Sequence, residues 1–173
     1  MNQWDATSLI TCAKFQVDGR LVLDYALDVA QIVITKKVKE ETVDAGLAGG
    51  YMDAAVIKAR IDAGQIEVRS VTRFSDPFEA VLDDYGLEDG DKAVVRLALQ
   101  APDVHASVTD DRLLFVVLHR CGKKALFLPD YIEQGISDGV FDAATGMKLL
   151  HAVSPRLPQG FVSHSLRRLE GVI

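Results

Sequence analysis

Short apolar segments alternate with amphipathic ones along most of this chain. The apolar segments predict five strands, near residues 3–7, 31–35, 66–71, 104–108 and 124–127. Between them, apolar residues recur at helical spacing, which predicts helices near residues 9–15, 21–29, 37–47, 54–63, 77–85 and 91–100. This alternation is typical of a three-layer α/β/α domain with a mainly parallel central sheet and right-handed crossovers.

The segment from Leu113 to Leu118 fits two kinds of element. Its side chains are all apolar and are β-branched or aromatic often enough for a buried strand. Its position between two predicted strands, and the length of that interval, favour a helix. We therefore predict a helix at this segment.

The pattern after residue 128 contains helices only. Three short amphipathic helices are predicted, at residues 128–137, 141–153 and 162–169. The sequence contains no repeat, no low-complexity segment and no Pro- or Gly-rich linker. We therefore predict one domain over residues 1–173, with a core at 1–128 and a short helical C-terminal extension at 129–173.

Four acidic residues stand near the predicted ends of these elements. Asp5 lies at the carboxyl end of the first strand, and Asp111 follows the strand at 104–108. Glu41 and Asp91 fall in the first or second turn of two helices. In open parallel sheets, ligands bind at the carboxyl ends of the strands where the strand order reverses, so acids there are well placed for chemistry. Spacing alone does not require the four to converge.

Four sequence blocks in order resemble the PIN-domain nuclease family. They are Trp4-Asp5-Ala6-Thr7-Ser8-Leu9-Ile10, then Val38-Lys39-Glu40-Glu41, then Leu87-Glu88-Asp89-Gly90-Asp91-Lys92-Ala93-Val94-Val95, and finally Ser107-Val108-Thr109-Asp110-Asp111-Arg112. The last block is similar to a Thr-Asp-Asp-Arg motif found in one subset, which also has a helical C-terminal tail. The resemblance covers residues 3 to 128. Three residues depart from the usual pattern: Ala6, Lys37 and Asp91.

The resemblance implies a PIN-like fold and a site of four catalytic carboxylates that also bind metal: Asp5, Glu41, Asp91 and Asp111. The family pattern places the last acid two residues after the threonine, so Asp111 is preferred to Asp110 as a metal ligand and Asp110 is a second choice. Glu40 replaces Glu41 if the helix register slips by one residue. Thr7 matches a hydroxyl position that helps to orient the acids, and Arg112 follows the acids, where it can contact substrate phosphate.

Carboxylates are the ligands that Mg²⁺ and Mn²⁺ prefer. Clustered carboxylates repel one another until a cation binds, and a bound cation can activate a water for attack on phosphorus. This chemistry needs no side-chain nucleophile. That agrees with the sequence, in which the Ser, Cys and His residues form no recognisable nucleophile constellation. We therefore expect an endoribonuclease that requires Mg²⁺ or Mn²⁺ and hydrolyses RNA phosphodiester bonds.

Simpler interpretations of the same residues stay open. Asp5 can be the N-cap of the first helix, Thr7 can be a cap, Asp91 can interact with a helix dipole, and Glu41 can lie on a solvated helix face. Two other functions also stay open. One is a PIN-like interaction protein without activity, and the other is a phosphoryl-transfer or phosphatase-like α/β enzyme in which Asp5 is a covalent nucleophile.

Composition sets the expected surroundings of such a protein. The chain has 173 residues and 49% hydrophobic content, enough for one sizeable core. Its start lacks the basic and apolar regions of a signal peptide, its longest apolar run is too short for a bilayer, and its two cysteines cannot form a disulfide framework. We expect a cytoplasmic protein that does not bind membranes.

Charge and the resemblance bear on the partners. The formal net charge of −6 is unusual for a protein that binds RNA, because phosphate contacts are normally made by basic residues. Carboxylates that share a metal site account for part of it. The resemblance also implies a toxin neutralised by an antitoxin protein whose tail enters the acidic groove. The apolar helical tail leads us to expect a homodimer.

Overall fold

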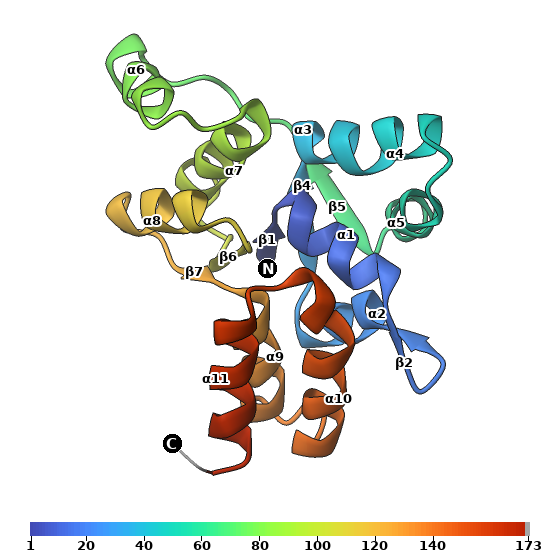
Figure 1. Cartoon of the computed structure of the whole chain (residues 1–173). Coiled ribbons are helices and arrows are strands. Elements are labelled where there is room, and N and C mark those ends of the chain that lie inside the picture. The colour runs from blue at the N-terminus through green and yellow to red at the C-terminus, as the bar shows by residue number, and fades with distance from the viewer. Residues whose placement is uncertain (172–173) are drawn as a thin grey trace.

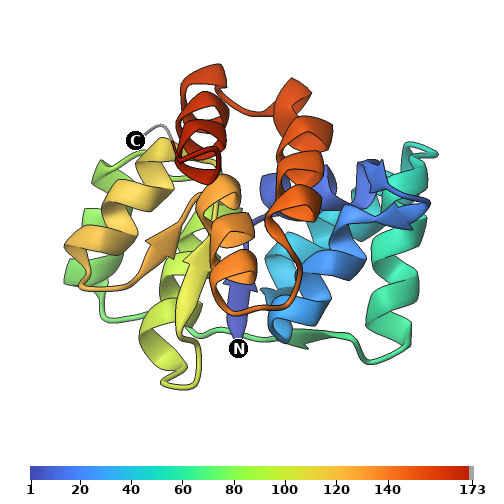
Figure 2. The same ribbon diagram turned by 90° about the horizontal axis from the view of Figure 1, so that it is seen from below.

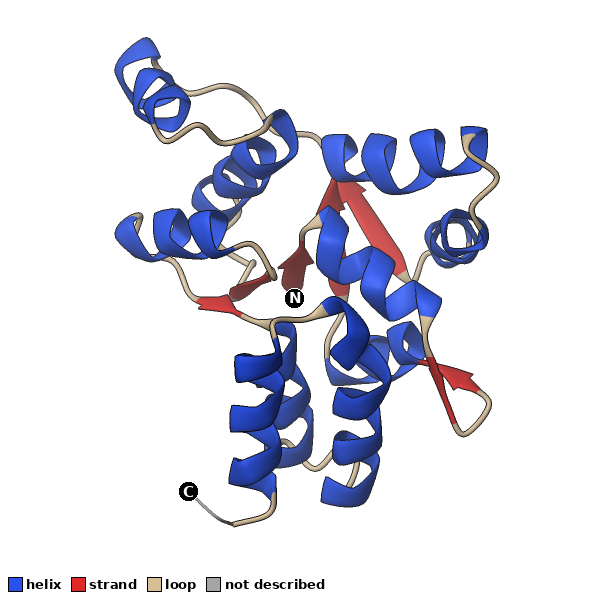
Figure 3. Ribbon diagram, viewed as in Figure 1, coloured by secondary structure: helices blue, strands red, loops and turns tan. Residues whose placement is uncertain are grey.

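A five-stranded parallel sheet forms the centre of the molecule in the computed structural model, which describes residues 1–171 (Figures 1 and 3). The strand order is β5-β4-β1-β6-β7. The strands are β1 (Asn2–Trp4), β4 (Ile32–Thr35), β5 (Ile66–Arg69), β6 (Ala106–Val108) and β7 (Ala125–Leu126). Every neighbouring pair in this sheet is parallel. The expectation of an α/β chain with a mainly parallel sheet is therefore confirmed.

Helices cover both faces of the sheet because the chain builds it in two directions from the centre. The first half runs from β1 outward to β4 and β5, and the second half runs from β6 outward to β7. Right-handed crossovers in opposite directions place their helices on opposite faces. Helices α7 and α8 thus lie on one side of the sheet, and α1, α2 and α5 lie on the other (Figures 1 and 2). The strand order reverses between β1 and β6.

The seven helices of the core region agree with the predicted segments to within a few residues. Each buries at least one side chain against its neighbours, and α7 and α8 pack directly on strands of the sheet. Leu113 to Leu118 is helical, as predicted, and its buried residues recur at helical spacing. The bounds are α1 (Ala6–Lys14), α2 (Val22–Val29), α3 (Lys36–Lys39) continued by α4 (Ala45–Ala48), α5 (Met52–Asp62), α6 (Asp76–Asp84), α7 (Asp89–Gln100) and α8 (Arg112–Arg120).

Three local features differ from the predictions. The first strand ends at Trp4 and not at Thr7, because Asp5 caps α1, which therefore begins at Ala6 rather than at Leu9. A short antiparallel hairpin, β2 (Gln16–Val17) with β3 (Arg20–Leu21), was not predicted. Its turn is Asp18-Gly19 with positive φ at both residues, a common hairpin turn, but two-residue strands give no periodic signal. Between α3 and α4 the helix widens into a π-helical turn, η1 (Glu40–Asp44).

The C-terminal region forms α9 (Leu128–Ser137), α10 (Ala143–Val153), the short 3₁₀ turn η2 (Ser154–Arg156) and α11 (Gln159–Leu169), which confirms the three predicted helices. These helices pack on one another, and α9 also packs against α2 and β7 (Figure 2). The Tyr131 ring meets the Trp4 ring edge-on, and its hydroxyl donates to the carbonyl oxygen of Ala26 at 3.0 Å. The extension therefore shares the core of the preceding residues. None of the described helices combines the length and apolarity needed to cross a membrane.

Candidate active site

The candidate site lies at the carboxyl ends of β1 and β6, the two strands between which the order reverses. These strands are neighbours in register, with Trp4 opposite Val108. The backbone N–H of Asp5 donates to the carbonyl oxygen of Val108 at 3.1 Å. The residues that follow the two strands are thereby held side by side. This is where open α/β sheets bind ligands.

The carboxylate of Asp5 is buried and both of its oxygens accept hydrogen bonds. Oδ1 accepts from the backbone N–H of Ser8 at 2.8 Å, so Asp5 is the N-cap of α1. Oδ2 accepts from the hydroxyl of Thr109 at 2.6 Å. Burial raises the pKa of Asp5, and these hydrogen bonds oppose that effect. The capping interpretation is correct in geometry, but the second oxygen makes a contact that a cap does not need.

Thr109 connects Asp5 to Asp111. Its hydroxyl oxygen donates to Asp5 and accepts from the backbone N–H of Asp111 at 3.0 Å. Asp111 is in turn the N-cap of α8, where its Oδ1 accepts from the backbone N–H of Leu114 at 2.8 Å. One buried hydroxyl thus fixes two acidic caps relative to each other.

Glu41 and Asp91 reach the site from two helices that face each other. Glu41 belongs to the π-helical turn, and its carboxylate lies against Gly90 in the first turn of α7. A Cβ atom at position 90 would stand 2.5 Å from Oε1 of Glu41, so a larger residue there would displace this carboxylate from its present position. π-turns occur often at functional sites, because the extra residue changes the direction in which a side chain points.

The four predicted acids line one pocket of about 280 Å³. Thr7 and one further carboxylate, Glu88, also line it. Among the described residues around it, five are acidic and none is basic. The acids come from β1, η1, the start of α7 and the end of β6, which are distant in sequence and adjacent in space. The structure therefore brings Asp5, Glu41, Asp91 and Asp111 together.

Burial and neighbouring charges raise the pKa values of Asp91 and Glu41 in this pocket. The pKa of Asp91 is raised to about 7, first by burial and then by the charges of Asp111 and Asp5. Burial also raises the pKa of Glu41, and Glu88 contributes to this shift. A carboxyl group without a cationic partner favours its protonated form. The metal-free pocket is consequently strained at neutral pH, and a cation would relieve the strain.

The two alternative ligands point elsewhere. Asp110 faces away from the pocket: its Oδ2 accepts from the hydroxyl of Ser8 at 3.2 Å and its Oδ1 from the backbone N–H of Leu128 at 3.2 Å. Burial and the charge of Asp5 raise the pKa of Asp110 to about 6. Glu40 forms an ion pair with Lys37 at 2.9 Å on the other side of α3. Asp111 and Glu41 are thus the acids of each pair that line the pocket.

The two predicted substrate contacts have different positions. Thr7 lies in α1, not at its cap, and it is exposed at the edge of the pocket. Arg112 does not line the acidic pocket. Its guanidinium lies 5.3 Å from the centre of the Phe161 ring, and it lines a separate hollow beside α11. An Arg112 contact with a phosphate at the acids would need this side chain to move.

The donor atoms of the pocket suit a divalent metal ion, but their present spacing does not. Hard divalent cations take carboxylate oxygens, and this pocket offers five carboxylates without a basic neighbour. Within residues 1–171, however, no group of three or more His, Cys, Asp and Glu side chains has a geometry that could hold a metal ion. Because Asp5 and Asp111 both keep capping hydrogen bonds, coordination by three of the acids requires side-chain adjustment.

Three contributors escaped prediction as site residues: Ser8, Thr109 and Glu88. Ser8 and Thr109 lie inside the sequence blocks that were singled out, but a hydroxyl in an Asp-rich segment is most often a local cap. Only the pairing of β1 with β6 shows that it connects two segments.

Comparison of the chain with protein-family models, curated proteins and solved structures gives no match. The function must therefore be argued from the site itself.

Proposed function

We propose that this chain is a PIN-like endoribonuclease that uses Mg²⁺ or Mn²⁺ to hydrolyse RNA phosphodiester bonds. The observation that supports the proposal most is the convergence of Asp5, Glu41, Asp91 and Asp111 in one pocket at the reversal of strand order. These are the four acids that the resemblance to PIN-domain nucleases assigns. Asp5 is buried and Asp91 half-buried in a pocket without basic residues, which weakens a fold, so the presence of the acids together is better explained by a cationic ligand than by stability.

The residues of the pocket have distinct tasks in this proposal. Thr109 and the N-terminus of α1 hold Asp5 in a fixed orientation, and Thr109 also sets the position of Asp111. Asp91 keeps its proton up to about pH 7 while no cation is bound, and Glu41 closes the opposite wall. When bound, Mg²⁺ or Mn²⁺ would neutralise these charges and lower the pKa of a water that attacks phosphorus.

The alternatives are less well supported by the geometry. Covalent catalysis by Asp5 would need one of its oxygens to give up a hydrogen bond and attack phosphorus as the sole nucleophile, and this role leaves the other three acids of the pocket without a task. Trapping with beryllium fluoride would identify such an aspartyl enzyme. A binding protein without activity could use the same five carboxylates to hold a cation or a basic peptide, and cleavage assays distinguish it from a nuclease.

The central test compares Asp5→Asn with Asp142→Asn. Asp142 is also an aspartate N-cap, of α10, and accepts from the backbone N–H of Thr145 at 2.7 Å, far from the pocket in the helical extension. Asparagine is a good N-cap, so neither substitution should unfold the protein. We expect Asp5→Asn to lower cleavage of unstructured RNA by about 10³-fold or more, because it removes one carboxylate from a site that acts as a unit. Asp142→Asn should cleave normally.

Melting curves supply a readout besides activity. Mn²⁺ should raise the melting temperature of wild type and of Asp142→Asn, because the ion binds the folded state, and should raise that of Asp5→Asn less. In chelator, Asp5→Asn should be as stable as wild type or more stable, since it removes one of several repelling charges. Full cleavage by Asp5→Asn, or equal Mn²⁺ shifts in all three proteins, would refute the assignment.

The proposal extends to a toxin role and to a homodimer, both on the resemblance and on the helical extension. A neighbouring reading frame for a small protein with a DNA-binding segment and an Arg-rich tail would support the toxin role. Light scattering at micromolar concentration tests the dimer, because a single monomeric mass contradicts it.

A further inference from the structure

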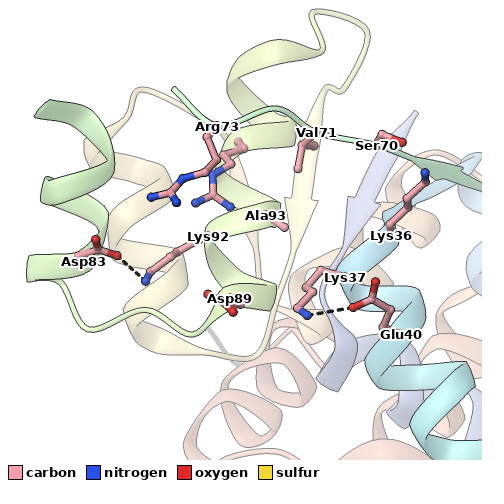
Figure 4. Close-up of a pocket in the computed structure, with 11 residues that line it drawn as sticks. Lys36, Lys37, Glu40, Ser70, Val71, Arg73, Asp83, Asp89, Lys92 and Ala93 are labelled. Carbon is pink, nitrogen blue, oxygen red and sulfur yellow. Dashed lines mark hydrogen bonds and ion pairs between the residues drawn. The ribbon is translucent and has the colours of Figure 1, made fainter. Parts of the chain in front are cut away.

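A second and larger hollow, of about 640 Å³, adjoins the acidic pocket on the other side of α3 and α7 (Figure 4). We refer to it as the basic cleft. It is lined by Lys36, Lys37, Glu40, Ser70, Val71, Arg73, Asp83, Asp89, Lys92, Ala93 and Arg96. Five of these side chains are basic and three are acidic, whereas the whole chain carries a formal charge of −6. The lining therefore carries a small net positive charge on an acidic protein, and one of its five cations, Arg96, is paired with the buried carboxylate of Glu79.

The basic cleft and the acidic pocket share their two helical walls. On α3 and η1, Lys37 and Glu40 face the cleft, whereas Glu41 faces the pocket. On α7, Lys92 faces the cleft and Asp91 faces the pocket. Neighbouring residues of one helix thus line different hollows, so the two hollows lie on either side of the same two helices.

The cations of the cleft stand on separate elements instead of converging on one point. Lys36 and Lys37 project from α3, Arg73 from the loop after β5, and Lys92 from α7 (Figure 4). Arg96 lies one turn further along α7. Such an arrangement suits several negative charges in a row better than a single anion. A sugar-phosphate backbone has this regular spacing of charge, and a stripe of Lys and Arg is the usual footprint of nucleic-acid binding.

A buried carboxylate holds one wall of the cleft in place. Glu79 of α6 accepts two hydrogen bonds from Arg96 and one from the backbone N–H of Phe74 at 2.8 Å. Arg73, in the same loop, lies 3.7 Å from Glu79 and stays largely exposed. The cation-bearing loop and α7 are thus fixed relative to each other before any ligand binds, which lowers the entropy cost of binding.

Two of the three acids in the cleft are paired with its lysines: Glu40 with Lys37 at 2.9 Å and Asp83 with Lys92 at 2.5 Å. The Glu40–Lys37 pair is exposed on both sides, and such pairs are weak, so a phosphate can replace Glu40 as the partner of Lys37. The third acid, Asp89, lies between Lys37 and Lys92 in the cleft and reduces its positive charge (Figure 4).

We infer that the basic cleft binds the phosphate backbone of single-stranded RNA next to the segment that enters the acidic pocket. The inference rests on the proposed ribonuclease function, because the acidic pocket defines where the reacting phosphate would lie. It adds the substrate-binding surface: the nucleotides on one side of the cleaved bond cross α3 and α7 and meet Lys36 and Arg73 on opposite walls of the cleft.

The test measures binding without cleavage. Fluorescence anisotropy with a labelled single-stranded RNA of about 12 nucleotides is recorded in chelator over a series of salt concentrations. The double variant Lys36→Glu/Arg73→Glu is compared with Lys124→Glu/Arg167→Glu, which makes the same change in net charge at exposed residues outside both hollows. We expect the cleft variant to bind at least about tenfold more weakly, with a salt slope smaller by about 1.4 for two lost phosphate contacts, and the control to bind like wild type.

Three outcomes would overturn the inference. They are an equal loss in both double variants, no RNA binding by wild type at low salt, and competition by poly-glutamate as strong as that by RNA, which would identify an acidic protein partner. Cleavage assays separate this inference from the proposed function. Loss of the cleft should raise KM for long RNA and leave hydrolysis of a dinucleotide unchanged, whereas a wild type that binds RNA in the cleft but never cleaves it would contradict the nuclease alone.

Discussion

The two faces of the α3–α7 pair treat buried carboxylates in opposite ways. On the face of the acidic pocket, burial and the neighbouring acids raise the pKa of Asp91 to about 7. On the face of the basic cleft, the hydrogen bonds from Arg96 lower the pKa of Glu79 to about 2, although little of the Glu79 side chain is exposed. Burial raises the pKa of both acids, so the partner decides the direction of each shift.

This difference distinguishes the acidic pocket, which can bind a ligand, from the Glu79–Arg96 pair, which holds helices in place. Glu79 is ionised, hydrogen-bonded and tied to Arg96, so it stabilises the position of α6 and its loop. Asp91 and its neighbours have no cation among the described residues of their pocket, so their mutual repulsion lowers the free energy of unfolding. A ligand of opposite charge recovers that energy on binding. The raised pKa of Asp91 therefore points to a ligand site, whereas the lowered pKa of Glu79 points to a structural ion pair.

Breaking the Glu79–Arg96 ion pair should have the largest effect on stability. We expect Glu79→Gln to lower the free energy of unfolding by about 3 kcal/mol, because it leaves the charge of Arg96 buried without a partner. Urea unfolding at pH 7 measures this. Glu67→Gln is the matched control: it removes an exposed partner of Arg69, which keeps Asp103, and should cost less than about 1 kcal/mol. Equal effects of the two variants would mean that the Glu79 pair is not structural.

The same pair predicts a dependence on acid pH. The folded-state pKa of Glu79, about 2, lies below its ordinary value of 4.5, so its contribution to stability is present above pH 4.5 and is lost as the pH falls towards 2. The difference in unfolding free energy between wild type and Glu79→Gln should therefore shrink over this interval. A constant difference from pH 6 to pH 2.5 would contradict it.

Thr109→Val tests how the acidic pocket is organised. The substitution removes the hydroxyl that donates to Asp5 and accepts from the backbone N–H of Asp111. We expect a loss of about 2 kcal/mol in chelator, because the buried carboxylate of Asp5 and the part-buried N–H of Asp111 each lose a hydrogen bond. Thr109→Ser keeps the hydroxyl and should lose about 1 kcal/mol at most, for one buried methyl group. NMR titration should also show a higher pKa for Asp5 in the valine variant. An unchanged pKa would mean that Thr109 does not orient this carboxylate.

Asp91 should give the smallest effect and the opposite pH dependence to Glu79. Its folded-state pKa, about 7, lies above its ordinary value of 3.8, so the protonated form contributes stability that is complete below pH 3.8 and is lost as the pH rises through 7. In chelator, Asp91→Asn should therefore become more stable than wild type between pH 5 and 8, by about 1 kcal/mol after allowance for solvent screening. Mn²⁺ should remove the difference. A wild type whose stability is independent of pH in chelator would show that the acids of the pocket are not strained.

Most of the fold could be predicted from the sequence because it depends on local patterns. The five strands of the sheet and the long helices follow from the period of apolar residues, and even Leu113 to Leu118 was placed correctly as a helix. The errors are at boundaries where a side chain competes with the strand, as at Asp5, and at the two-residue strands of the β2–β3 hairpin. The π-helical turn at Glu41 also gives no periodic signal that distinguishes it from an α-helix.

The sequence by itself determined which acids could form a site, since the residue types and their order along the chain are local information. Only the tertiary structure decided that they share a pocket, that Glu41 and Asp111 line it instead of Glu40 and Asp110, and that Thr109 joins Asp5 to Asp111. The basic cleft was beyond the sequence for the same reason. Its cations come from α3, α7 and the loop after β5, and their proximity depends on parallel pairing and helix packing between segments that no local pattern relates.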